Sequence, residues 1–574
     1  MRLDDFFTPE TARRARFIER RGRGNPFITA LEYDSRRVKP GNLYFALPGI
    51  HADGHAFIAG ALKRGAAAVI HQRPLEEILP AGRITVEGSG TRPFQRIPAG
   101  TEDKFGPVFI RVENSRFAMS PAAAAFCGFP AAKLRLAGVT GTEGKSTTVY
   151  LIWQLLRLAG KKAGFISTVQ YSRGGEAMWN SEHQTTPEAP AVHTGLAAML
   201  EGGAEYAVIE ASSHGLSPRT NRLGDIRFDA AVITNVAHEH LEFHGTWEQY
   251  RNDKANLFRS LDARREEKQE ALPPFGVING DDKSAPYFAA ATKQKTLRFS
   301  TGGQGMEAAD LKLLSLESGA GGNRYRILSA GSGGVLQTED FLPGAFNAGN
   351  VLAALLAVSG LLETPVETLI PLVPSLRPVR GRMTAVKKGQ PFEVLVDYAH
   401  TPSSFETIFP PLRARLDRAG GRIISLFGSA GERDTGKRPE QGRIAARWSD
   451  AVILTDEDPR GEDPMTLLEE IARGCETRTD SGADREPDAA GNSPKPGKRP
   501  PIRRGESLFL IPGRPEAIRK AFSLARPGDL VLLLGKGHEN SIIYRDYSME
   551  YDEIGEAEKA LAELGYGLTC TAGK

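Results

Sequence analysis

The stretch LRLAGVTGTEGKSTTVYLIWQLLRLAG, residues 134–160, places a short apolar run, a glycine-rich loop and a longer helical pattern in direct succession. The loop, TGTEGKST at 140–147, offers backbone N–H groups for phosphate oxygens, and the helix N-terminus adds positive potential. Lys145 is suited to reach terminal phosphates and Ser146 to ligate Mg²⁺. The strict GxxxxGK[ST] spacing is missed by one residue, because the earlier glycine stands six positions before Gly144. The stretch predicts a nucleoside triphosphate site, which many unrelated enzymes share.

Polar residues follow the other strand-like runs at the point where each run ends. YAVIE ends at Glu210, and AAVIT leads into NVAHEHLEFHG, which carries His238 and His240. Four runs in the last part of the chain show the same feature, in VLVDYAHTP, SLFGSAGERD, VILTDEDPRGEDP and LLLGKGHEN. Near-continuous apolar strands that alternate with helices predict parallel sheets covered on both faces. Because ligands bind outside the carboxyl ends of such strands, we expect two facing sites, one for nucleotide and metal and one for substrate recognition.

One lysine lies where a charge is unexpected. GTWEQYRNDKANLF, residues 245–258, predicts a helix that starts at Thr246, with Gln249 completing a capping box. Lys254 falls on the apolar stripe of this helix. A lysine stem often packs against apolar neighbours while its ammonium reaches water. The alternative is a lysine paired with an anion or chemically modified inside a site, because a bare buried ammonium carries a heavy desolvation cost.

The composition of the chain excludes several classes of protein. The 574 residues include 73 basic and 70 acidic ones, a net charge of +3, which gives no reason to expect nucleic acid. Three cysteines without a CxxC pair predict no disulfide framework. The first residues lack the apolar stretch of a signal peptide, and the apolar runs fall far short of the ~20 residues that cross a bilayer. We therefore expect a soluble, cytoplasmic protein without membrane insertion.

Glycine-rich punctuation and alternating apolar runs predict an α/β protein of three domains. The expected domains are residues 1–132, 133–376 and 377–574. An Ala-rich helix is expected from Ser120 at the end of the first domain. Two stretches, about 88–107 and 476–505, are polar and rich in Gly and Pro. The second contains almost nothing apolar and is expected to be a disordered insertion without a role in chemistry.

Taken in their order, these motifs resemble those of the Mur ligase family, and most closely its MurE branch. The matching segments are TGTEGKST, EASSHGL, NVAHEHLEFHG with Lys254 downstream, GAFNAGN, DYAHTP, FGSAGERDTGKRP, DPRGEDP and GKGHE. The stretch YDSRRVKPGNLYFALPGIHADGHAFI, residues 33–58, is similar to the uridine-nucleotide region of the same branch. The resemblance covers nearly the whole chain outside the two polar stretches, and many ordered motifs make it far more specific than any one of them.

The resemblance implies an N-terminal α/β domain for the uridine nucleotide, a central ATP-binding domain with a P-loop ATPase-like parallel sheet, and a C-terminal Rossmann-like domain for an amino acid. It implies an ATP-dependent ligase that adds a diamino acid to the D-Glu side-chain carboxylate of UDP-N-acetylmuramoyl-L-alanyl-D-glutamate in peptidoglycan precursor synthesis. The carboxylate would become an acyl phosphate, which the amine then attacks. Mg²⁺ and Lys145 would neutralise the charge of the transferred phosphoryl group.

The resemblance also implies site residues by position. Those expected to hold ATP are Gly141, Thr142, Glu143, Gly144, Lys145, Ser146, Thr147, Asn347, Asn350 and Asp397. Those expected to contact the UDP-linked dipeptide are Ser35, Thr185, Thr186, Ser212, Thr220 and Arg222. Those expected around the amino acid are Arg433, Asp458, Arg460, Gly535 and Glu539. The expected Mg²⁺ ligands are Ser146, Glu210, His240 and a carbamylated Lys254, the last three of which form the catalytic set with Lys145.

Three positions depart from the family pattern. Glu143 stands in the phosphate loop where the family more often has Asn, and Thr220 stands nearest to an expected Gln. Asp458 replaces the Asn of an Asp-Asn-Pro-Arg motif. Glu143 is compatible with phosphates only if its carboxylate points away from them. Asp458 either pairs with Arg460 and cancels its charge, or adds a second anion that favours a purely cationic amino-acid side chain.

The incoming amino acid is expected to be meso-diaminopimelate, with lysine or ornithine as the alternatives. Arg460 offers a planar, two-pronged donor for the distal carboxylate of diaminopimelate. The resemblance marks this arginine as typical of diaminopimelate users. Glu539 is then expected to take the distal ammonium.

Two other functions are compatible with a phosphate loop. An amide ligase of the folylpolyglutamate synthase type shares the fold, but the DSR…GNLYFAL region and the DPR…GKGHE pair argue against it. A P-loop NTPase that acts as a switch or motor would hydrolyse nucleotide without a small-molecule acceptor. That function leaves the C-terminal arginine and glutamate motifs unexplained.

Overall fold

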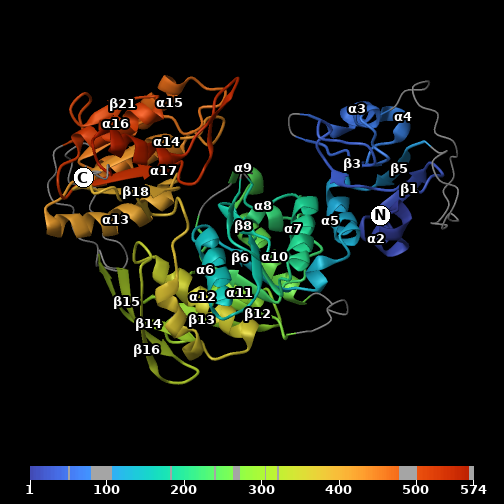
Figure 1. Ribbon diagram of the computed structural model, residues 1–574, viewed down its shortest axis with the longest axis horizontal. Coiled ribbons are helices and arrows are strands. Elements are labelled where there is room, and N and C mark those ends of the chain that lie inside the picture. Colours follow the sequence, from blue (N-terminus) through green and yellow to red (C-terminus); the bar gives the residue numbers. More distant parts are fainter. Residues whose placement is uncertain are drawn as a thin grey trace, which may run out of the picture.

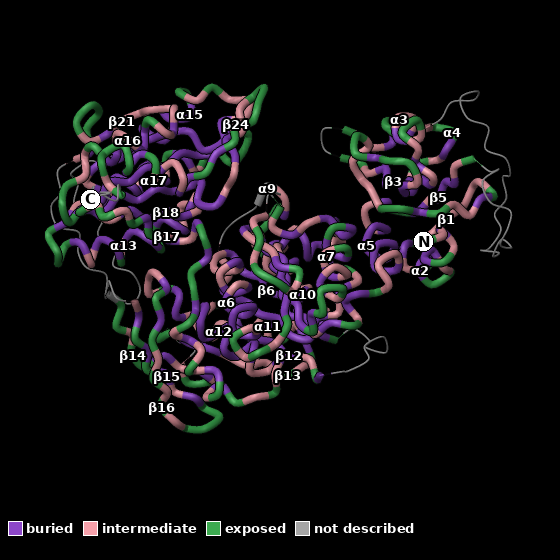
Figure 2. The backbone as a smooth tube through the Cα atoms, viewed as in Figure 1, coloured by how far each residue is buried: buried purple, intermediate pink, exposed green. Residues whose placement is uncertain are grey.

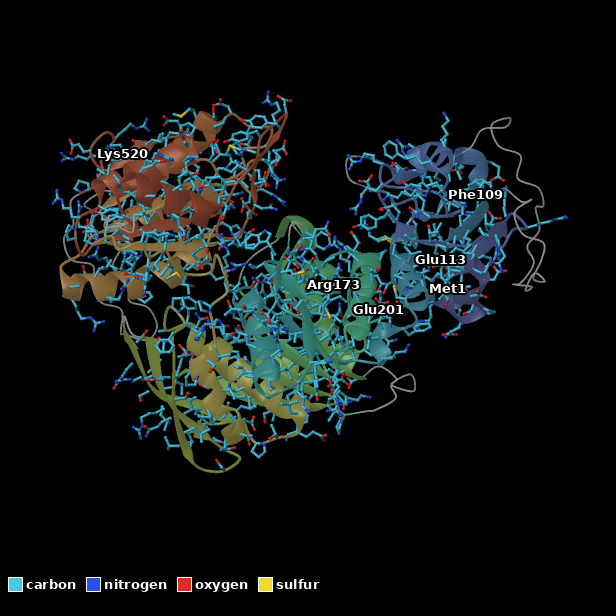
Figure 3. The ribbon with its side chains drawn as sticks, in the orientation of Figure 1. Met1, Phe109, Glu113, Arg173, Glu201 and Lys520 are labelled. Atoms are coloured by element: carbon cyan, nitrogen blue, oxygen red, sulfur yellow. The ribbon has the colours of Figure 1, made fainter. Side chains whose placement is uncertain are left out.

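Three principal sheets organise the protein in the computed structural model (Figure 1). The structure describes residues 1–49, 52–78, 106–180, 184–237, 241–262, 272–303, 306–319, 322–476 and 501–567. In Figure 1 the N-terminal domain (blue) and the C-terminal domain (orange and red) lie on either side of the central domain. Phe109 and Lys520, labelled in Figure 3, belong to these two outer domains. Each sheet has hydrophobic clusters of its own on both faces.

The N-terminal sheet has the strand order β1-β5-β4-β3-β2, in which only β1 runs antiparallel to its neighbour. Its strands are β1 Phe17–Arg21, β2 Leu31–Glu32, β3 Leu43–Phe45, β4 Ala68–His71 and β5 Val108–Val112. The Ala-rich helix α5 spans Ser115–Phe126, so the expected start at Ser120 is wrong. The Asn114 side chain accepts a hydrogen bond from the Phe117 N–H and starts the helix five residues earlier.

The middle of the central sheet is parallel, in the order β13-β12-β11-β6-β10-β7. Its strands are β6 Arg135–Thr140, β7 Ala163–Ile166, β10 Tyr206–Glu210, β11 Ala230–Ile233, β12 Phe275–Asn279 and β13 Lys295–Ser300. The helices that matter here are α6 Lys145–Leu158, α7 Ala189–Glu201, α8 Ser213–Leu216, α10 Trp247–Arg259 and α12 Asn347–Leu362. Val139 packs with α6 and α12 on one face, whereas Leu136 packs with α7 and α10 on the other.

Further strands extend this sheet at both edges, each antiparallel to its neighbour except at the parallel pair of β13 and β14. They are β8 Gln170–Ser172 and β9 Met178–Trp179 at one edge, and β14 Leu311–Gly319, β15 Gly322–Ser329 and β16 Val335–Asp340 at the other. Buried and more exposed residues alternate along β15 and β16, and Figure 2 shows exposed stretches on this ribbon. Strands that alternate buried and exposed residues contain fewer apolar residues than the buried parallel ones, which explains why the β15 and β16 strands were not predicted.

The C-terminal sheet has the order β17-β18-β22-β19-β20-β21, parallel except for β17. Its strands are β17 Thr384–Ala385, β18 Glu393–Asp397, β19 Ile423–Phe427, β20 Ala451–Leu454, β21 Leu508–Leu510 and β22 Leu530–Leu534. One face is covered by α13 Pro402–Ala419, α14 Lys437–Trp448 and α15 Pro464–Glu476. The other is covered by α16 Arg514–Leu524 and α17 Glu553–Glu563. A hairpin, β23 Ser541–Ile543 with β24 Ser548–Glu550, follows the sheet.

The edges of the predicted insertion at 476–505 belong to the fold, and here the prediction is wrong. Glu476 ends α15, and Ile502 is buried in the same core as that helix. The Arg504 guanidinium pairs with Glu469 and Glu476 of α15. Residues 477–500, and residues 88–105 of the other polar stretch, lie outside the described residues.

The predicted capping box of α10 is half formed. Thr246 Oγ1 accepts a hydrogen bond from the Gln249 N–H at 3.1 Å. The Gln249 side chain instead donates to Asp253 at 2.9 Å, so the second bond of the box is absent from this described helix.

Within the described ranges, no single helix is long and apolar enough to cross a bilayer. Helix α12 and the segment Val366–Ser375, taken together, have the length and composition of a membrane span, but the pair is bent by 109°. Helix α12 is buried in the core of the central domain.

Candidate active site between the central and C-terminal domains

The phosphate loop connects β6 to α6 at the carboxyl end of the central sheet. Gly141 has φ +152° and Gly144 has φ +81°. A Cβ on Gly141 would lie 1.9 Å from Thr234 Oγ1, and a Cβ on Gly144 would lie 2.5 Å from Asn350 Oδ1. Only glycine fits at both positions, so the tight turn leaves the N-terminus of α6 open to a ligand.

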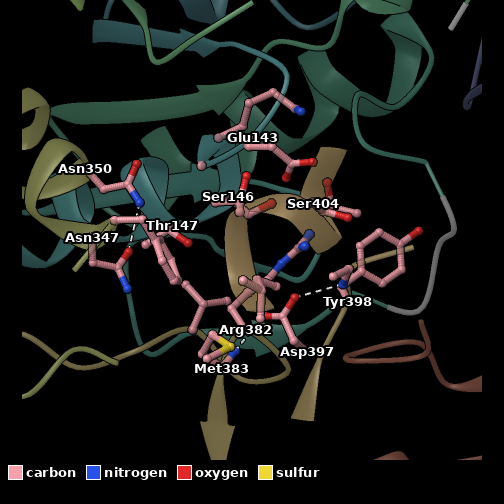
Figure 4. A pocket seen from close by; sticks show the side chains of 18 of the residues that line it. Glu143, Ser146, Thr147, Asn347, Asn350, Arg382, Met383, Asp397, Tyr398 and Ser404 are labelled. Carbon is pink, nitrogen blue, oxygen red and sulfur yellow. Dashed lines mark hydrogen bonds between the residues drawn. The ribbon is translucent and has the colours of Figure 1, made fainter. Parts of the chain in front are cut away.

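A cavity lies in front of this loop, between the central and C-terminal domains (Figure 4). The predicted site residues that line it are Thr142, Glu143, Gly144, Lys145, Ser146, Thr147, Thr185, Glu210, Asn347, Asn350 and Asp397. Apolar surface comes from Leu342 and Phe346 on the central side and from Met383 and Ile408 on the C-terminal side. The cavity therefore joins a phosphate-binding loop to apolar walls large enough for the flat face of a base.

The backbone of the phosphate loop is held from the β11 side. The Glu143 N–H donates to Asn235 Oδ1 at 2.9 Å, and the Glu143 carbonyl accepts from Thr234 Oγ1 at 2.6 Å. Glu143 itself is half-buried on the cavity wall. Lys145 Nζ donates to the Thr142 carbonyl at 2.7 Å, within the loop. That the Glu143 carboxylate points away from bound phosphates stays a prediction.

Ser146 and Glu210 meet at the cavity wall. The Ser146 hydroxyl lies 3.0 and 2.9 Å from the two Glu210 carboxylate oxygens, and the Thr168 N–H donates to one of these at 2.8 Å. Glu210 is 1% exposed. A buried carboxylate beside a hydroxyl is an oxygen donor set that fits Mg²⁺. Among the described residues no group of three or more His, Cys, Asp or Glu is placed to hold a metal, and His240 lies outside them.

Lys254 lies on α10 with 1% of its surface exposed. Its Nζ donates to the Gly141 carbonyl at 2.6 Å and lies 4.3 Å from the centroid of the Tyr250 ring. Of the two alternatives for this side chain, the one in which the ammonium reaches water is therefore wrong. The head group ends inside the protein, at the first residue of the phosphate loop.

Asn347 and Asn350 stand in the first turn of α12, facing the loop. Asn350 Oδ1 accepts from Thr148 Oγ1 at 3.1 Å, and Asn350 Nδ2 donates to Asn347 Oδ1 at 2.8 Å. Asn347 Nδ2 donates to the Pro343 carbonyl at 2.8 Å. Both amides thus have fixed orientations, and they define the central-domain side of the cavity.

The C-terminal domain enters the cavity through the end of β18. Asp397 accepts hydrogen bonds from the Met383 N–H at 2.7 Å and from the Ala399 N–H at 2.8 Å. Burial raises the pKa of Asp397 above the ordinary value, against the lowering effect of Arg382. Arg382 lies 4.6 Å from the centroid of the Tyr398 ring, and both residues line the cavity.

The residues expected at the UDP-linked dipeptide lie mainly around the end of β10. Thr186 Oγ1 donates to the Glu210 carbonyl at 2.7 Å and accepts from the Ser212 N–H at 2.9 Å. Arg222 donates to the Thr186 carbonyl at 2.7 Å and to Glu188 at 3.0 Å.

Two other residues of this set behave differently. The Thr220 hydroxyl donates to the carbonyls of His214 and Ser217, so it is occupied by the turn after α8. Ser35 lies in the N-terminal domain, beyond the end of β2.

The predicted amino-acid site contains a buried ammonium that donates to two of its carboxylates. Lys536 is 0% exposed, and its Nζ donates to Asp458 Oδ1 at 2.8 Å and to Glu539 Oε2 at 2.5 Å. Burial lowers the pKa of Lys536, but Glu539 and Asp458 raise it more, so that it lies above the ordinary value for lysine. The Tyr398 hydroxyl donates to Glu539 Oε1 at 3.2 Å and links this group to the nucleotide cavity.

Asp458 does not pair with Arg460, contrary to the first of the two expectations for it. Its Oδ1 accepts from Lys536 and from the Ile543 N–H at 3.0 Å. Arg460 adopts φ +54°, and its own N–H donates to the Ile543 carbonyl at 2.9 Å. Within the described ranges, Arg460 Nε is buried without a hydrogen-bond partner. The Arg460 side chain therefore has one buried donor that the described part of the fold leaves unsatisfied.

The two other residues expected at the amino acid differ in their surroundings. Arg433 is exposed on the loop after β19. Gly535 follows β22 with φ +99°, and a Cβ on it would lie 3.1 Å from Glu457 Oε2. Glycine at this position lets the β22 end approach the buried Glu457 carboxylate.

Several residues of the site were missed by reasoning from the sequence. They are Thr168, Arg382, Tyr398, Glu457 and Lys536. Tyr398, Glu457 and Lys536 directly follow or lie within quoted strand-end motifs, so their position was a usable signal. Their partners were not readable, because Lys536 meets Asp458 across 78 positions of the chain.

The fold and the site define a nucleotide-binding α/β protein with two strand-end clusters that face one interdomain cavity. Three family models match the chain: "Mur ligase family, catalytic domain" at residues 27–89, "Mur ligase middle domain" at 139–358 and "Mur ligase, glutamate ligase domain" at 381–537.

Curated relatives match over nearly the full length. A UDP-N-acetylmuramyl-tripeptide synthetase of Treponema denticola is 46% identical over 570 residues, covering 96% of each chain. A UDP-N-acetylmuramoyl-L-alanyl-D-glutamate–2,6-diaminopimelate ligase of Geobacillus kaustophilus is 35% identical over 94% of this chain and 96% of the relative. A solved structure of a ligase with that same name is 25% identical, with a TM-score of 0.55 over 94% of this chain and 96% of the other.

The chain belongs to the Mur ligase family. It is therefore a ligase, and the expected resemblance to the MurE branch is confirmed by its relatives. A folylpolyglutamate synthase of Mycobacterium tuberculosis, 16% identical with a TM-score of 0.53 over 73% of this chain and 92% of the other, shares the fold alone. The alternatives of a folylpolyglutamate synthase and of an NTPase switch lose their support.

Proposed function

We propose that this chain is a cytoplasmic, ATP-dependent ligase of peptidoglycan precursor synthesis. It adds a diamino acid to the D-Glu side-chain carboxylate of UDP-N-acetylmuramoyl-L-alanyl-D-glutamate, and its domains divide near residues 132 and 376. The observation that carries the proposal is the cavity in which the phosphate loop and Glu210 of the central domain face Asp397 and Tyr398 of the C-terminal domain. The names of the relatives indicate the acceptor.

The central domain holds ATP and its metal in this proposal. The N–H groups of the loop and Lys145 surround the phosphates, and Asn347 and Asn350 lie toward the base. Ser146 and Glu210 would hold Mg²⁺, together with His240, and the ion would neutralise charge on the phosphates. The D-Glu carboxylate oxygen attacks the γ-phosphorus, ADP leaves, and an acyl phosphate forms.

The buried Lys254 supports a covalent modification. Addition of CO₂ to its neutral amine, with loss of a proton, would give a carbamate. The modification replaces a buried cation by an anion suited to Mg²⁺ at the edge of the phosphate loop, where Lys254 Nζ already contacts the Gly141 carbonyl.

The acceptor lies between the N-terminal and central domains in this proposal. Its dipeptide contacts residues around the end of β10, namely Thr185, Thr186, Ser212 and Arg222. Ser35 contacts the uridine nucleotide end. Thr220 has the weakest support, because its hydroxyl already bonds two carbonyls.

The C-terminal cluster takes the amino acid, for which we favour meso-diaminopimelate over lysine and ornithine. Arg460 retains a guanidinium that Asp458 does not neutralise, which supports binding of a distal carboxylate. Glu539, which shares Lys536 with Asp458, is the proposed acceptor for the distal ammonium, with Arg433 and Gly535 completing the site. The amine attacks the acyl phosphate carbon, the C–N bond forms, and phosphate leaves while the nitrogen loses a proton.

A competition assay tests this proposal. Purified protein is given the UDP-linked dipeptide, ATP, Mg²⁺ and equal amounts of meso-diaminopimelate, lysine and ornithine. The proposal expects a tripeptide mass that corresponds mainly to diaminopimelate. A tripeptide that contains only lysine or ornithine would overturn the amino-acid choice, and no tripeptide with any of them would overturn the function.

A further inference from the structure

The charges of Lys536 and its two carboxylate partners do not balance among themselves. The Lys536 ammonium contacts two carboxylates, Asp458 and Glu539, whose side chains are 10% and 16% exposed. One ammonium compensates one carboxylate, so these three side chains together keep one negative charge. Arg460, on the loop after Asp458, supplies one positive charge that no described carboxylate pairs with.

A ligand group that carries both a positive and a negative charge would match this separation of charge. A carbon that carries both an ammonium and a carboxylate presents one positive and one negative group a few ångströms apart. The excess negative charge at Lys536 is suited to the ammonium, and the Arg460 guanidinium to the carboxylate. A side chain whose distal end carries only an ammonium would pair with the excess negative charge at Lys536 and would leave the Arg460 guanidinium without a ligand carboxylate.

We infer that Lys536 is a positioning residue that sets the amino-acid preference of the ligase. This inference rests on the proposed function and adds to it the residue that fixes the charge of the site. Lys536 holds the Asp458 and Glu539 carboxylates at their present spacing and cancels one of their two charges. The site then selects a diamino acid whose distal end is zwitterionic over one whose distal end is purely cationic.

The location of Lys536 supports a role in selection rather than in phosphoryl transfer. Its Nζ donates to the two carboxylates, and neither of these side chains lines the nucleotide cavity. Only Tyr398, which bonds Glu539, reaches that cavity (Figure 4). Changes at Lys536 are therefore expected to alter the KM for the amino acid and to leave the KM for ATP nearly unchanged.

Two substitutions with opposite charge effects form the test. Lys536→Met removes the ammonium and leaves two uncompensated carboxylates, which favours a cationic distal end. Asp458→Asn removes one carboxylate and leaves a neutral Lys536–Glu539 pair, which disfavours a cationic distal end. The measured quantity is the ratio of kcat/KM for meso-diaminopimelate to that for lysine.

We expect Lys536→Met to lower this ratio and Asp458→Asn to raise it, each by roughly 10-fold on the scale of one charged hydrogen bond. The double variant restores the count of one excess negative charge, so its ratio should return to within roughly 3-fold of the starting value. Lys559→Met, an exposed lysine of α17, serves as the matched control and should change nothing.

Ratios that fall together in both single variants, or that do not move, would overturn the inference and leave Lys536 a structural residue. Should Lys536→Met not fold, Asp458→Asn decides alone, because a lowered or unchanged ratio in that variant contradicts the inference. The parent enzyme separates this outcome from the larger proposal. If the parent enzyme forms the tripeptide and the kcat/KM ratios of the variants equal that of the parent, only the role of Lys536 is overturned. If the parent enzyme forms no tripeptide, the proposed function is overturned.

Discussion

The phosphate loop and the Lys536 cluster occupy equivalent places, at the carboxyl ends of parallel strands, but they are built from different chemistry. The loop presents backbone N–H groups, glycines with positive φ and the hydroxyl of Ser146. The cluster presents a buried ammonium between two carboxylates, with Arg460 beside them. The first arrangement suits any polyphosphate, whereas the second distinguishes amino acids by the charges they carry. The difference indicates that catalysis and selection are separable in this chain, and the predictions below test that separation.

The largest effect is expected at Lys254. Lys254→Ala should lower ligation by at least ~10²-fold, the scale of losing one preorganised electrostatic group at a reacting centre. Short carboxylic acids added to the assay should restore part of the activity if a carbamate is lost. Lys295→Ala, an exposed lysine of β13, is the control. A Lys254→Ala enzyme with most of its activity would contradict the carbamylation proposal.

A similar loss is expected at the phosphate loop, with a distinct signature. Lys145→Met removes a cation from the phosphates and should reduce kcat/KM by ~10²-fold for every amino acid offered. Because Lys145 Nζ donates within its own loop, to the Thr142 carbonyl, the thermal midpoint should hardly change. The ratio of diaminopimelate to lysine use should stay constant. A shifted ratio would show that the two clusters are not separable.

A substitution at Arg460, unlike Lys145→Met, should change the ratio of diaminopimelate to lysine use, and its loss of activity should be smaller. Arg460→Ala is expected to cost diaminopimelate at least ~10-fold in kcat/KM, from the loss of a charged, two-pronged hydrogen bond. Lysine use should remain nearly unchanged, because lysine has no distal carboxylate. Arg473→Ala, on the exposed side of α15, provides the comparison. Equal losses for both amino acids would place Arg460 outside the selection of the distal end.

The smallest effect is expected from the polar insertion. Replacing residues 477–500 by a short Gly/Ser bridge should leave turnover within a few-fold, because their composition offers little apolar area for a core. Extending the deletion to 476–505 also removes the buried Ile502 and the Arg504 ion pairs, and should cost about 1.5–3 kcal/mol of stability from Ile502 alone. Thermal unfolding of the two deletions compares them directly, and loss of folding in the shorter one would contradict the prediction.

The sequence predicted the parts of this molecule that depend on local pattern. The succession of strand, loop and helix at 134–160 and the strands of the C-terminal sheet were readable because buried parallel strands are apolar throughout. The β14–β16 ribbon was not predicted, because β15 and β16 alternate buried with more exposed residues and so lack a continuous apolar run. The start of α5 was misplaced because the capping Asn114 precedes the Ala-rich part.

The sequence predicted the site less completely than the fold, and the reason is physical. Lys254 stood out because its charge conflicted with its own helix face. The pairing of Asp458 depends on Lys536, which is far away in the chain, so the proximity of Arg460 in sequence suggested the wrong partner. Charge pairing across strand ends is set by sheet order, which single motifs do not reveal.

The most direct test of the account is the stoichiometry of ADP release. ADP and tripeptide are measured in parallel with all three substrates and with each of the dipeptide and the amino acid omitted. The account predicts equal amounts of ADP and tripeptide in the complete mixture, no sustained ADP release without the UDP-linked dipeptide, and at most one ADP per enzyme without the amino acid. Sustained ADP release without the UDP-linked dipeptide would contradict it and mark the cavity as that of a simple nucleotide hydrolase.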